Sequence, residues 1–275
     1  MTPESPGPRA GAFAFSRLRA LAAFACGAVI GTLGGLIGLG GAEFRLPLLI
    51  GAFRLKALDA VILNKAMSLV VVAAALPLRA GTVPLGLVAA NGAVVATLLA
   101  GSLLGAWIGA GWAMRMEAAR LQRVMAALLA LIAVILLFGH GLSGGAGPLL
   151  EGPALTIAGV SAGFGIGVVA SLLGVAGGEL LIPTLVLLFG VDVKLAGSLS
   201  LAISLPTMLV GFSRYARDRS LTLLVRERGF VLLMAAGSLA GALIGGKLLG
   251  VVPEWVLLPG LAAILLLSAV RMWRH

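Results

Sequence analysis

Two glutamates stand inside otherwise apolar, glycine-rich stretches of this sequence, where a charged side chain is unfavourable. Glu43 follows the run GTLGGLIGLGGA, and Glu179 follows the run GVAGG. A proline comes four residues after each glutamate, Pro47 in the first stretch and Pro183 in the second. Because ionisable residues in apolar membrane segments mark functional sites by default, the two carboxyl groups are candidates for binding protons or ions.

The glycines and prolines of these stretches predict two interrupted helices. Glycine lowers helix stability and proline removes a backbone hydrogen bond. An interruption at membrane depth exposes N–H and C=O groups, which only protein or a wet cavity can satisfy. The N–H groups that open a new helix, together with its dipole, form an anion site. The predicted break residues are Gly38, Pro47, Gly174 and Pro183, and the predicted N–H donors are Gly40, Gly41, Gly177 and Gly178.

The sequence predicts two acidic side chains at the same place as an anion site, and these two features conflict. A carboxylate repels an anion unless it is protonated, and burial favours the protonated form. We therefore expect Glu43 and Glu179 to carry protons whose movement is coupled to that of the anion. In the alternative interpretation each glutamate caps the N–H groups of its own helix, or Glu43 pairs with Arg45.

A second polar cluster interrupts the apolar segment AVILNKAMSLVVVAAALP. Asn64 and Ser68 are four residues apart and share a helix face, and Lys65 lies beside them. Lys65 is expected either to contact an anionic substrate, or to extend to the cytoplasmic surface or pair with Asp59. The residues predicted to line the substrate path are Asn64, Lys65, Ser68, Ser200 and Ser204.

The chain is a tandem duplication. Glu43 and Glu179 are 136 residues apart (179 − 43), and the same offset relates GSLLGAWIG to GSLAGALIG further along. Such a repeat indicates two copies of one structural unit, and its regularly spaced small residues suit close helix packing. We expect a tail over residues 1–19, repeat one over 20–139, a linker over 140–152 and repeat two over 153–275.

Composition places the chain in a membrane. The 275 residues are 60% hydrophobic and 11% charged, whereas soluble domains contain about 25% charged residues. The net charge of +10 comes largely from short connections between apolar runs, which is a topology signal and not a nucleic-acid site. The single cysteine, Cys26, excludes an intramolecular disulfide and a multi-cysteine metal site. We expect no enzymatic activity, no catalytic residue, no cofactor and no metal.

The apolar segments number five in each repeat. The second segment of each, 42–53 or 180–190, is too short to cross alone, so it either forms a re-entrant hairpin with the break or crosses as a thin, tilted segment. Both arrangements give an odd number of crossings, which places the repeats in opposite orientations. The positive charges put both termini in the cytoplasm and the linker outside. The segments are 20–38, 42–53, 60–78, 85–112, 121–139, 153–173, 180–190, 195–213, 229–250 and 254–271.

The two motifs GLGGAEFRLP and GVAGGELLIP, with VDVKLAGSLSLAISLPTMLVGFSRYARDRS after the second, resemble the TauE/SafE sulfite-exporter family. The resemblance covers most of the chain, from about Cys26 to Arg271. It implies a multi-pass permease of the bacterial inner membrane that moves small anions, chiefly sulfite, sulfonates or related sulfur oxyanions, without an ATPase subunit.

The sequence therefore predicts an all-α secondary transporter of two inverted repeats, with glycine-rich broken or re-entrant helices near the midplane. Its expected partners are a small anionic substrate, the lipid bilayer and protons, with a homodimer left open and no nucleic acid. Two alternatives belong to other classes. A cation transporter would use Glu43 and Glu179 as ligands, and a membrane scaffold would only stabilise partner subunits.

Overall fold

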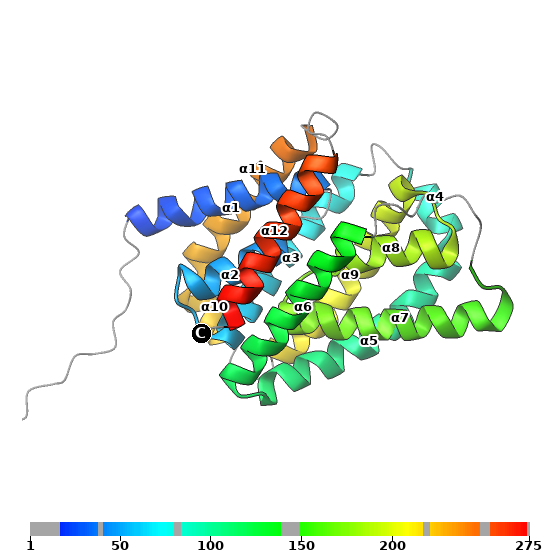
Figure 1. Ribbon diagram of the computed structural model, residues 1–275, viewed down its shortest axis with the longest axis horizontal. Helices are drawn as coiled ribbons and strands as arrows, with labels where there is room; N and C mark the ends of the chain where they lie inside the picture. The colour runs from blue at the N-terminus through cyan, green and yellow to red at the C-terminus, as the bar shows by residue number, and fades with distance from the viewer. Residues whose placement is uncertain are drawn as a thin grey trace, which may run out of the picture.

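The computed structural model is a bundle of helices (Figure 1). It describes residues 17–37, 41–79, 84–138, 149–216, 221–247 and 254–273, so that Gly38, Gly40 and most of the predicted tail and linker lie outside the described residues. Within these ranges the chain forms twelve helices and no strand. They are α1 (Arg17–Ile37), α2 (Ala42–Gly51), α3 (Ala57–Arg79), α4 (Leu85–Ala90), α5 (Gly92–Arg115), α6 (Ala118–Phe138), α7 (Gly152–Leu173), α8 (Gly178–Phe189), α9 (Val193–Tyr215), α10 (Leu221–Arg226), α11 (Arg228–Lys247) and α12 (Glu254–Trp273).

Six of these helices are long and apolar enough to cross a bilayer. They are α3, α5, α6, α7, α9 and α11. The outside of the bundle also carries large apolar side chains, such as Leu21, Ile157 and Leu267, which are 69%, 68% and 71% exposed. Outward-facing leucine and isoleucine suit contact with lipid tails. The predicted all-α membrane class is confirmed.

The predicted segmentation is wrong in two places. Segment 85–112 is divided at Asn91 into α4 and α5, because the Asn91 backbone leaves the helical region (φ −97°, ψ 24°). The Asn91 side chain also donates to the Leu87 carbonyl at 2.9 Å, competing with the helix ladder. Residues 221–226 form the short helix α10, where only a charged loop was expected. The described residues thus hold six helices in each half, not five segments.

Pro47 and Pro183 do not break the chain as predicted. Each lies inside a helix, Pro47 in α2 and Pro183 in α8. Each proline is only the sixth residue of its helix, so it removes one backbone hydrogen bond and leaves the rest of a short helix intact. The interruptions lie upstream instead, where Gly41 and Gly177 adopt left-handed conformations with φ of 72° and 81°. Only glycine adopts such angles without strain.

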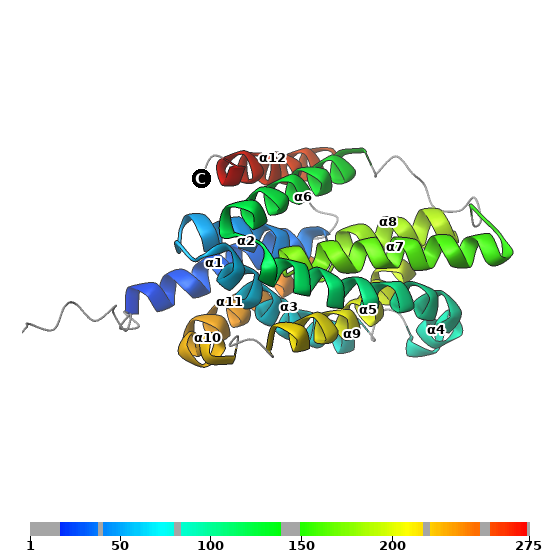
Figure 2. The same ribbon diagram turned by 90° about the horizontal axis from the view of Figure 1, so that it is seen from below.

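Close contacts at glycines join helices from the two halves of the chain. Helix α1 packs on α11, and α5 packs on α7 (Figures 1 and 2). A Cβ atom on Gly31 would overlap the backbone of Ser238, and one on Gly105 would overlap the backbone of Phe164. The predicted packing role of the small residues is confirmed. The glycines in these contacts are Gly27, Gly31 and Gly35 on α1, Gly101, Gly105 and Gly109 on α5, Gly163 and Gly167 on α7, and Gly237 and Gly241 on α11.

The first helices of the two halves enter the bundle from opposite ends. In Figures 1 and 2, α1 begins at the left and α7 at the right, and both run toward the middle. Helix α8 then folds back along α7, as two contacts near the start of α7 show. The Leu149 N–H donates to the Leu188 carbonyl at 3.2 Å, and the Phe189 ring lies so close to Gly159 that a Cβ atom there would meet it. The interruptions that precede α2 and α8 therefore lie inside the bundle.

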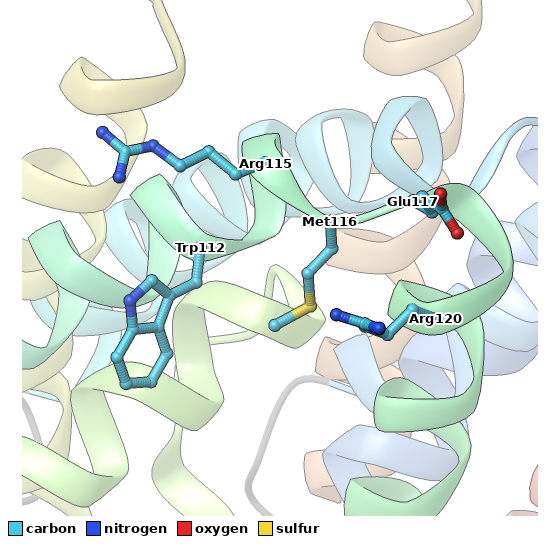
Figure 3. A pocket seen from close by; sticks show the side chains of 5 residues that line it. All are labelled: Trp112, Arg115, Met116, Glu117 and Arg120. Atoms are coloured by element: carbon cyan, nitrogen blue, oxygen red, sulfur yellow. The ribbon is translucent and has the colours of Figure 1, made fainter.

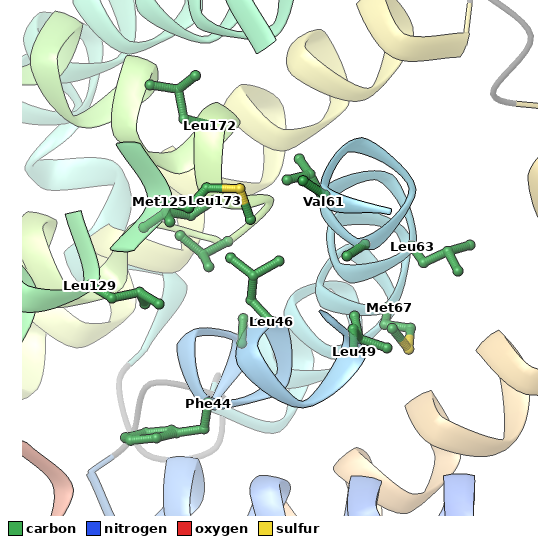
Figure 4. Close-up of a cluster of buried hydrophobic side chains, with 14 of the residues drawn as sticks. Phe44, Leu46, Leu49, Val61, Leu63, Met67, Met125, Leu129, Leu172 and Leu173 are labelled. Carbon is green, nitrogen blue, oxygen red and sulfur yellow. The ribbon is translucent and has the colours of Figure 1, made fainter. Parts of the chain in front are cut away.

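An apolar core holds α2 in place. Phe44, Leu46 and Leu49 of α2 are buried with side chains from α3, α6 and α7 (Figure 4). Leu46 and Leu49 are fully buried. At roughly 1.5–3 kcal/mol for each buried side chain of this size, this packing stabilises a helix too short to be stable alone. The first turn of α2 is thereby fixed in position.

Two glycines of α7 provide a test of this packing. Replacing Gly163 with alanine should destabilise the protein by about 1–3 kcal/mol, because the new methyl group would overlap the Leu98 carbonyl. Replacing Gly165 with alanine would place the methyl group in open space, with no other atom within 4 Å, and should be neutral or stabilising by up to about 1 kcal/mol. Thermal unfolding in detergent measures both; equal stability of the two variants would contradict the glycine contact.

Candidate functional site

The two glutamates predicted from the sequence open the two short helices. Glu43 lies in the first turn of α2 and Glu179 in the first turn of α8. Their side chains are only 2% and 3% exposed. The glycines before these helices, Gly41 and Gly177, offer no side-chain cap. Each helix therefore presents backbone N–H groups and a positive dipole end to the protein interior.

The carboxyl groups of Glu43 and Glu179 lie close enough to influence each other. Among the described residues, Glu43 Oε1 and both oxygens of Glu179 make no hydrogen bond. The structure thus brings two acidic groups together from positions 136 residues apart. Two ionised carboxylates at this place would repel each other.

Asn64 of α3 connects both interruptions. Its amide nitrogen donates to the Ala42 carbonyl at 3.0 Å and to the Leu173 carbonyl at 3.1 Å. These carbonyls belong to the start of α2 and the end of α7. Its amide oxygen accepts a hydrogen bond from Arg45 at 3.3 Å. Asn64, which is fully buried, uses its amide nitrogen and its amide oxygen to fix these helices relative to one another.

Arg45 is a site residue that the sequence interpretation considered only as a partner of Glu43. It is fully buried, and its guanidinium donates to Asn64, to Ser68 at 3.3 Å and to Ser238 at 3.2 Å. No ion pair between Glu43 and Arg45 occurs in the described part of the chain, although the two charges influence each other. The predicted shared face of Asn64 and Ser68 is confirmed, because both accept from the same nitrogen. A lone arginine within an apolar run was the available signal.

Lys65 lies on another side of α3 from Arg45. It is fully buried and donates to Ser171 Oγ at 3.2 Å, so it neither extends to the surface nor pairs with Asp59. Ser171 in turn donates to the Ala106 carbonyl at 2.9 Å. The Lys65 nitrogen lies against Gly211 of α9, where a Cβ atom would come within 2.7 Å of it. Lys65 is a second enclosed basic group, between α3, α7 and α9.

The two predicted serines of α9 differ in what they contact. Ser204 donates to the Ala176 carbonyl at 2.7 Å, and it thereby holds the interruption between α7 and α8. Ser200 donates to Gly197 of its own helix at 2.9 Å. Gly178 is the buried first residue of α8. Gly38 and Gly40, predicted in the first interruption, lie outside the described residues.

The glutamate pair is enclosed, and two pockets lined by described residues lie elsewhere. One, of about 400 Å³, is lined by Trp112, Arg115, Met116, Glu117 and Arg120 at the turn between α5 and α6 (Figure 3). The other, of about 860 Å³, lies between α1, α2 and α12 and reaches α2 at Phe44 and Pro47. Among the described residues no group of three His, Cys, Asp or Glu side chains could hold a metal ion. The site is therefore closed in this conformation.

Asn64 and Ser200 form a matched pair for testing the network. Replacing Asn64 with leucine should lower the free energy of unfolding by at least about 2 kcal/mol, because two buried carbonyls each lose a donor and Arg45 Nη1 loses one of its two acceptors. Replacing Ser200 with alanine should change it by less than about 1 kcal/mol, since only a bond within one helix is lost. Thermal unfolding of both purified variants is the measurement, and comparable losses would contradict the bridging role of Asn64.

Comparison with known proteins covers the first of the two halves. Residues 5–136 match the family model described as sulfite exporter TauE/SafE. This match includes Glu43, Arg45, Asn64, Lys65 and Ser68. No curated protein and no solved structure matches the chain.

Proposed function

We propose that this protein is a secondary transporter of a small anion, because residues 5–136 match the TauE/SafE sulfite exporter family, which consists of membrane transporters. Its substrate is a sulfur oxyanion such as sulfite or a sulfonate, and it works in the bacterial inner membrane. The observation that carries this proposal is the pair of uncapped helix starts, α2 and α8, enclosed in the bundle beside buried basic groups.

The transporter is built from two inverted repeats. Helices α3 and α9 begin at residues 57 and 193, the offset that separates the two glutamates, and each has 23 residues. The opposite directions of α1 and α7 in Figures 1 and 2 support inversion. The helix pairs support inversion as well, because the first helix of each half packs on a helix of the other half: α1 on α11, and α7 on α5. Each interruption then belongs to a re-entrant hairpin, α1 with α2 and α7 with α8, as inverted-repeat transporters use at their midplane.

The substrate site lies between the two interruptions. Backbone N–H groups at the starts of α2 and α8 attract an anion without being charged themselves. Asn64 and Ser68 border this place from α3, and Ser204 borders it from α9. Lys65 and Ser200 lie further along the same two helices. The N–H groups of the two helix starts replace part of the hydration shell of a small oxyanion bound here.

Glu43 and Glu179 couple anion movement to protons. With both groups ionised, the site holds two neighbouring negative charges and repels an anion. A proton taken up by the pair removes part of that repulsion, so that proton and anion bind together. Because every named side chain of the site is at most 3% exposed, alternating access requires one repeat to move against the other.

Proteoliposome uptake tests this function. Radiolabelled sulfite, sulfate and a sulfonate are supplied separately, with and without an imposed pH gradient. We expect accumulation of at least one sulfur oxyanion, enhanced by the gradient. Absence of flux for all three anions, with protein that is folded by thermal unfolding, would contradict the proposed function.

Neutral variants of the glutamates test the coupling. Glutamine resembles a permanently protonated glutamate, so Glu43→Gln and Glu179→Gln should abolish gradient-driven accumulation while leaving downhill exchange measurable. The exposed Glu117→Gln serves as the matched control and should behave as the wild type. Persistence of full gradient-driven accumulation in the double variant would remove protons as the coupling ion.

Cysteine accessibility tests the closed state. In a Cys26→Ser background, a cysteine at Ser204, which is 1% exposed, should react with a water-soluble thiol reagent far more slowly than one at Glu117. An alkanesulfonate, which unlike sulfite does not react with thiol reagents, should change the rate at residue 204 by shifting the population of open states, and should leave the rate at residue 117 unchanged. Equal rates at the two positions would contradict an enclosed site.

The cation alternative is not favoured. Two neighbouring carboxylates suit a cation, but fully buried Arg45 and Lys65 lie in the same region and would repel one. Thermal-shift measurements separate the two substrate classes. We expect stabilisation by oxyanions and none by divalent cations.

A further inference from the structure

Arg45 is a guanidinium enclosed in an apolar bundle, and it forms no ion pair with any described residue, although the nearby Glu43 acts on its charge. It is fully buried in α2, and the ion pairs formed by the described residues involve only Arg19, Arg226 and Glu227. Its three hydrogen-bond acceptors, the side chains of Asn64, Ser68 and Ser238, are all neutral. A buried charge of this kind is strongly unfavourable unless an opposite charge accompanies it.

The hydrogen bonds of Arg45 leave one edge of its guanidinium free. Nη1 makes two bonds, to Asn64 and Ser68, which uses both of its hydrogens. Nη2 makes one bond, to Ser238, and Nε makes none in the described part of the chain. Since a guanidinium has five N–H donors, the Nε–H and one Nη2–H remain. Neighbouring N–H groups of this kind form the fork that binds two oxygens of one anion.

The fold itself does not require an arginine at this position. The residue 136 positions further on is Leu181, which occupies the same place in α8 as Arg45 in α2. Leu181 is 1% exposed and packs among Leu98, Ile166 and Leu185. An apolar side chain therefore serves the packing role in one half of the chain. The charge in the other half calls for a different explanation.

The three neutral hydrogen-bond partners of Arg45 fix the orientation of its guanidinium, and so of the free edge. Asn64 is fixed by its own bonds to Ala42 and Leu173, and Ser238 lies at the glycine contact between α1 and α11. Three helices, α2, α3 and α11, thus meet at one guanidinium. A charged group immobilised in this way loses little further freedom when it binds a ligand.

We propose that Arg45 binds the transported anion directly, its Nε–H and remaining Nη2–H donating to two oxygens of the same oxyanion. This assignment rests on the proposed transport function, and it adds an explanation of which anions the transporter selects. A carboxylate, sulfonate or sulfite offers two oxygens at the spacing of the fork, whereas chloride offers a single centre. Arg45 thus selects oxyanions over halides. Asn64, Ser68 and Ser238 act as positioning residues.

Anion-dependent thermal stabilisation of the full-length protein in detergent measures this selection. Sodium sulfite under nitrogen, sodium sulfate and sodium chloride are titrated separately. The oxyanions should stabilise the wild-type protein at concentrations at least about tenfold lower than the chloride concentration that has the same effect. The reason is the additional hydrogen bond to the charged guanidinium, which is strong enough to change the affinity by that factor. Arg45→Gln should lose this stabilisation. Arg45→Lys, which keeps the charge without the fork, should retain binding but lose most of the preference over chloride.

Two controls separate a binding role from a structural one. Arg123→Gln removes an exposed positive charge and should leave the oxyanion response unchanged. The double variant Ser68→Ala with Ser238→Ala keeps the guanidinium and removes two of its positioning bonds. It should weaken oxyanion binding several-fold and lower the preference over chloride, and it serves as the test if Arg45→Gln does not fold. A purely structural arginine would change the melting temperature without changing that preference.

The outcomes distinguish this assignment from the transport function. A folded Arg45→Gln protein that keeps the wild-type sulfite response, in a protein whose wild type transports sulfite, overturns the role of Arg45 and leaves the transporter intact. An unchanged preference over chloride in the Ser68→Ala, Ser238→Ala protein overturns it as well. Wild-type protein that neither responds to nor transports any oxyanion overturns both proposals. Loss of the response in Arg45→Gln, with flux and response retained in Arg123→Gln, supports both.

Discussion

Buried polar groups that lack partners are the constraint on which the rest of this structure depends. Each interruption before α2 and α8 removes helix hydrogen bonds among buried residues, where the freed groups need partners within the protein. Asn64 satisfies carbonyls at the start of α2 and at the end of α7, and Ser204 satisfies the Ala176 carbonyl beside α8. One side chain on each central helix, α3 and α9, thereby serves an interruption. The glycines before the two helix starts supply no side-chain cap to their N–H groups.

Close helix contacts make this arrangement possible. Glycines on α1, α5, α7 and α11 let backbones from opposite halves touch, because no Cβ atom separates them. Ser238 belongs to one of these contacts, and it also accepts a hydrogen bond from Arg45. Packing and polar chemistry therefore meet at the same residue. A movement of α11 against α1 would alter the surroundings of the guanidinium.

The enclosed charges are not distributed symmetrically. Each half supplies one glutamate to the pair formed by Glu43 and Glu179, but the basic residues buried in the described part of the chain, Arg45 and Lys65, come from the first half alone. The corresponding positions in the second half are Leu181 and Leu201. The starts of α2 and α8, at residues 42 and 178, are related by the same offset of 136 residues, whereas the buried cations have no counterpart at that offset.

Much of the fold and part of the site were determined by the sequence alone. Composition predicts the all-α membrane class, and the glycine runs predict interruptions ahead of Glu43 and Glu179, because helix stability and burial of apolar residues are local properties. The prediction that Pro47 and Pro183 break the chain was wrong, since a proline near the start of a short helix removes only one backbone hydrogen bond.

Only the tertiary structure decided which polar groups meet. Arg45 contacts Ser238, and Lys65 contacts Ser171, across separations of 193 and 106 residues. The repeat offset aligns the two glutamates in sequence, but their approach depends on how α2 and α8 fold back into the bundle. Hydrogen bonds between distant segments depend on helix packing, and a local residue pattern does not indicate which distant residue a polar side chain will contact. The sequence thus identified the charged residues, and the packing of the helices decided which of them form no ion pair in the described part of the chain.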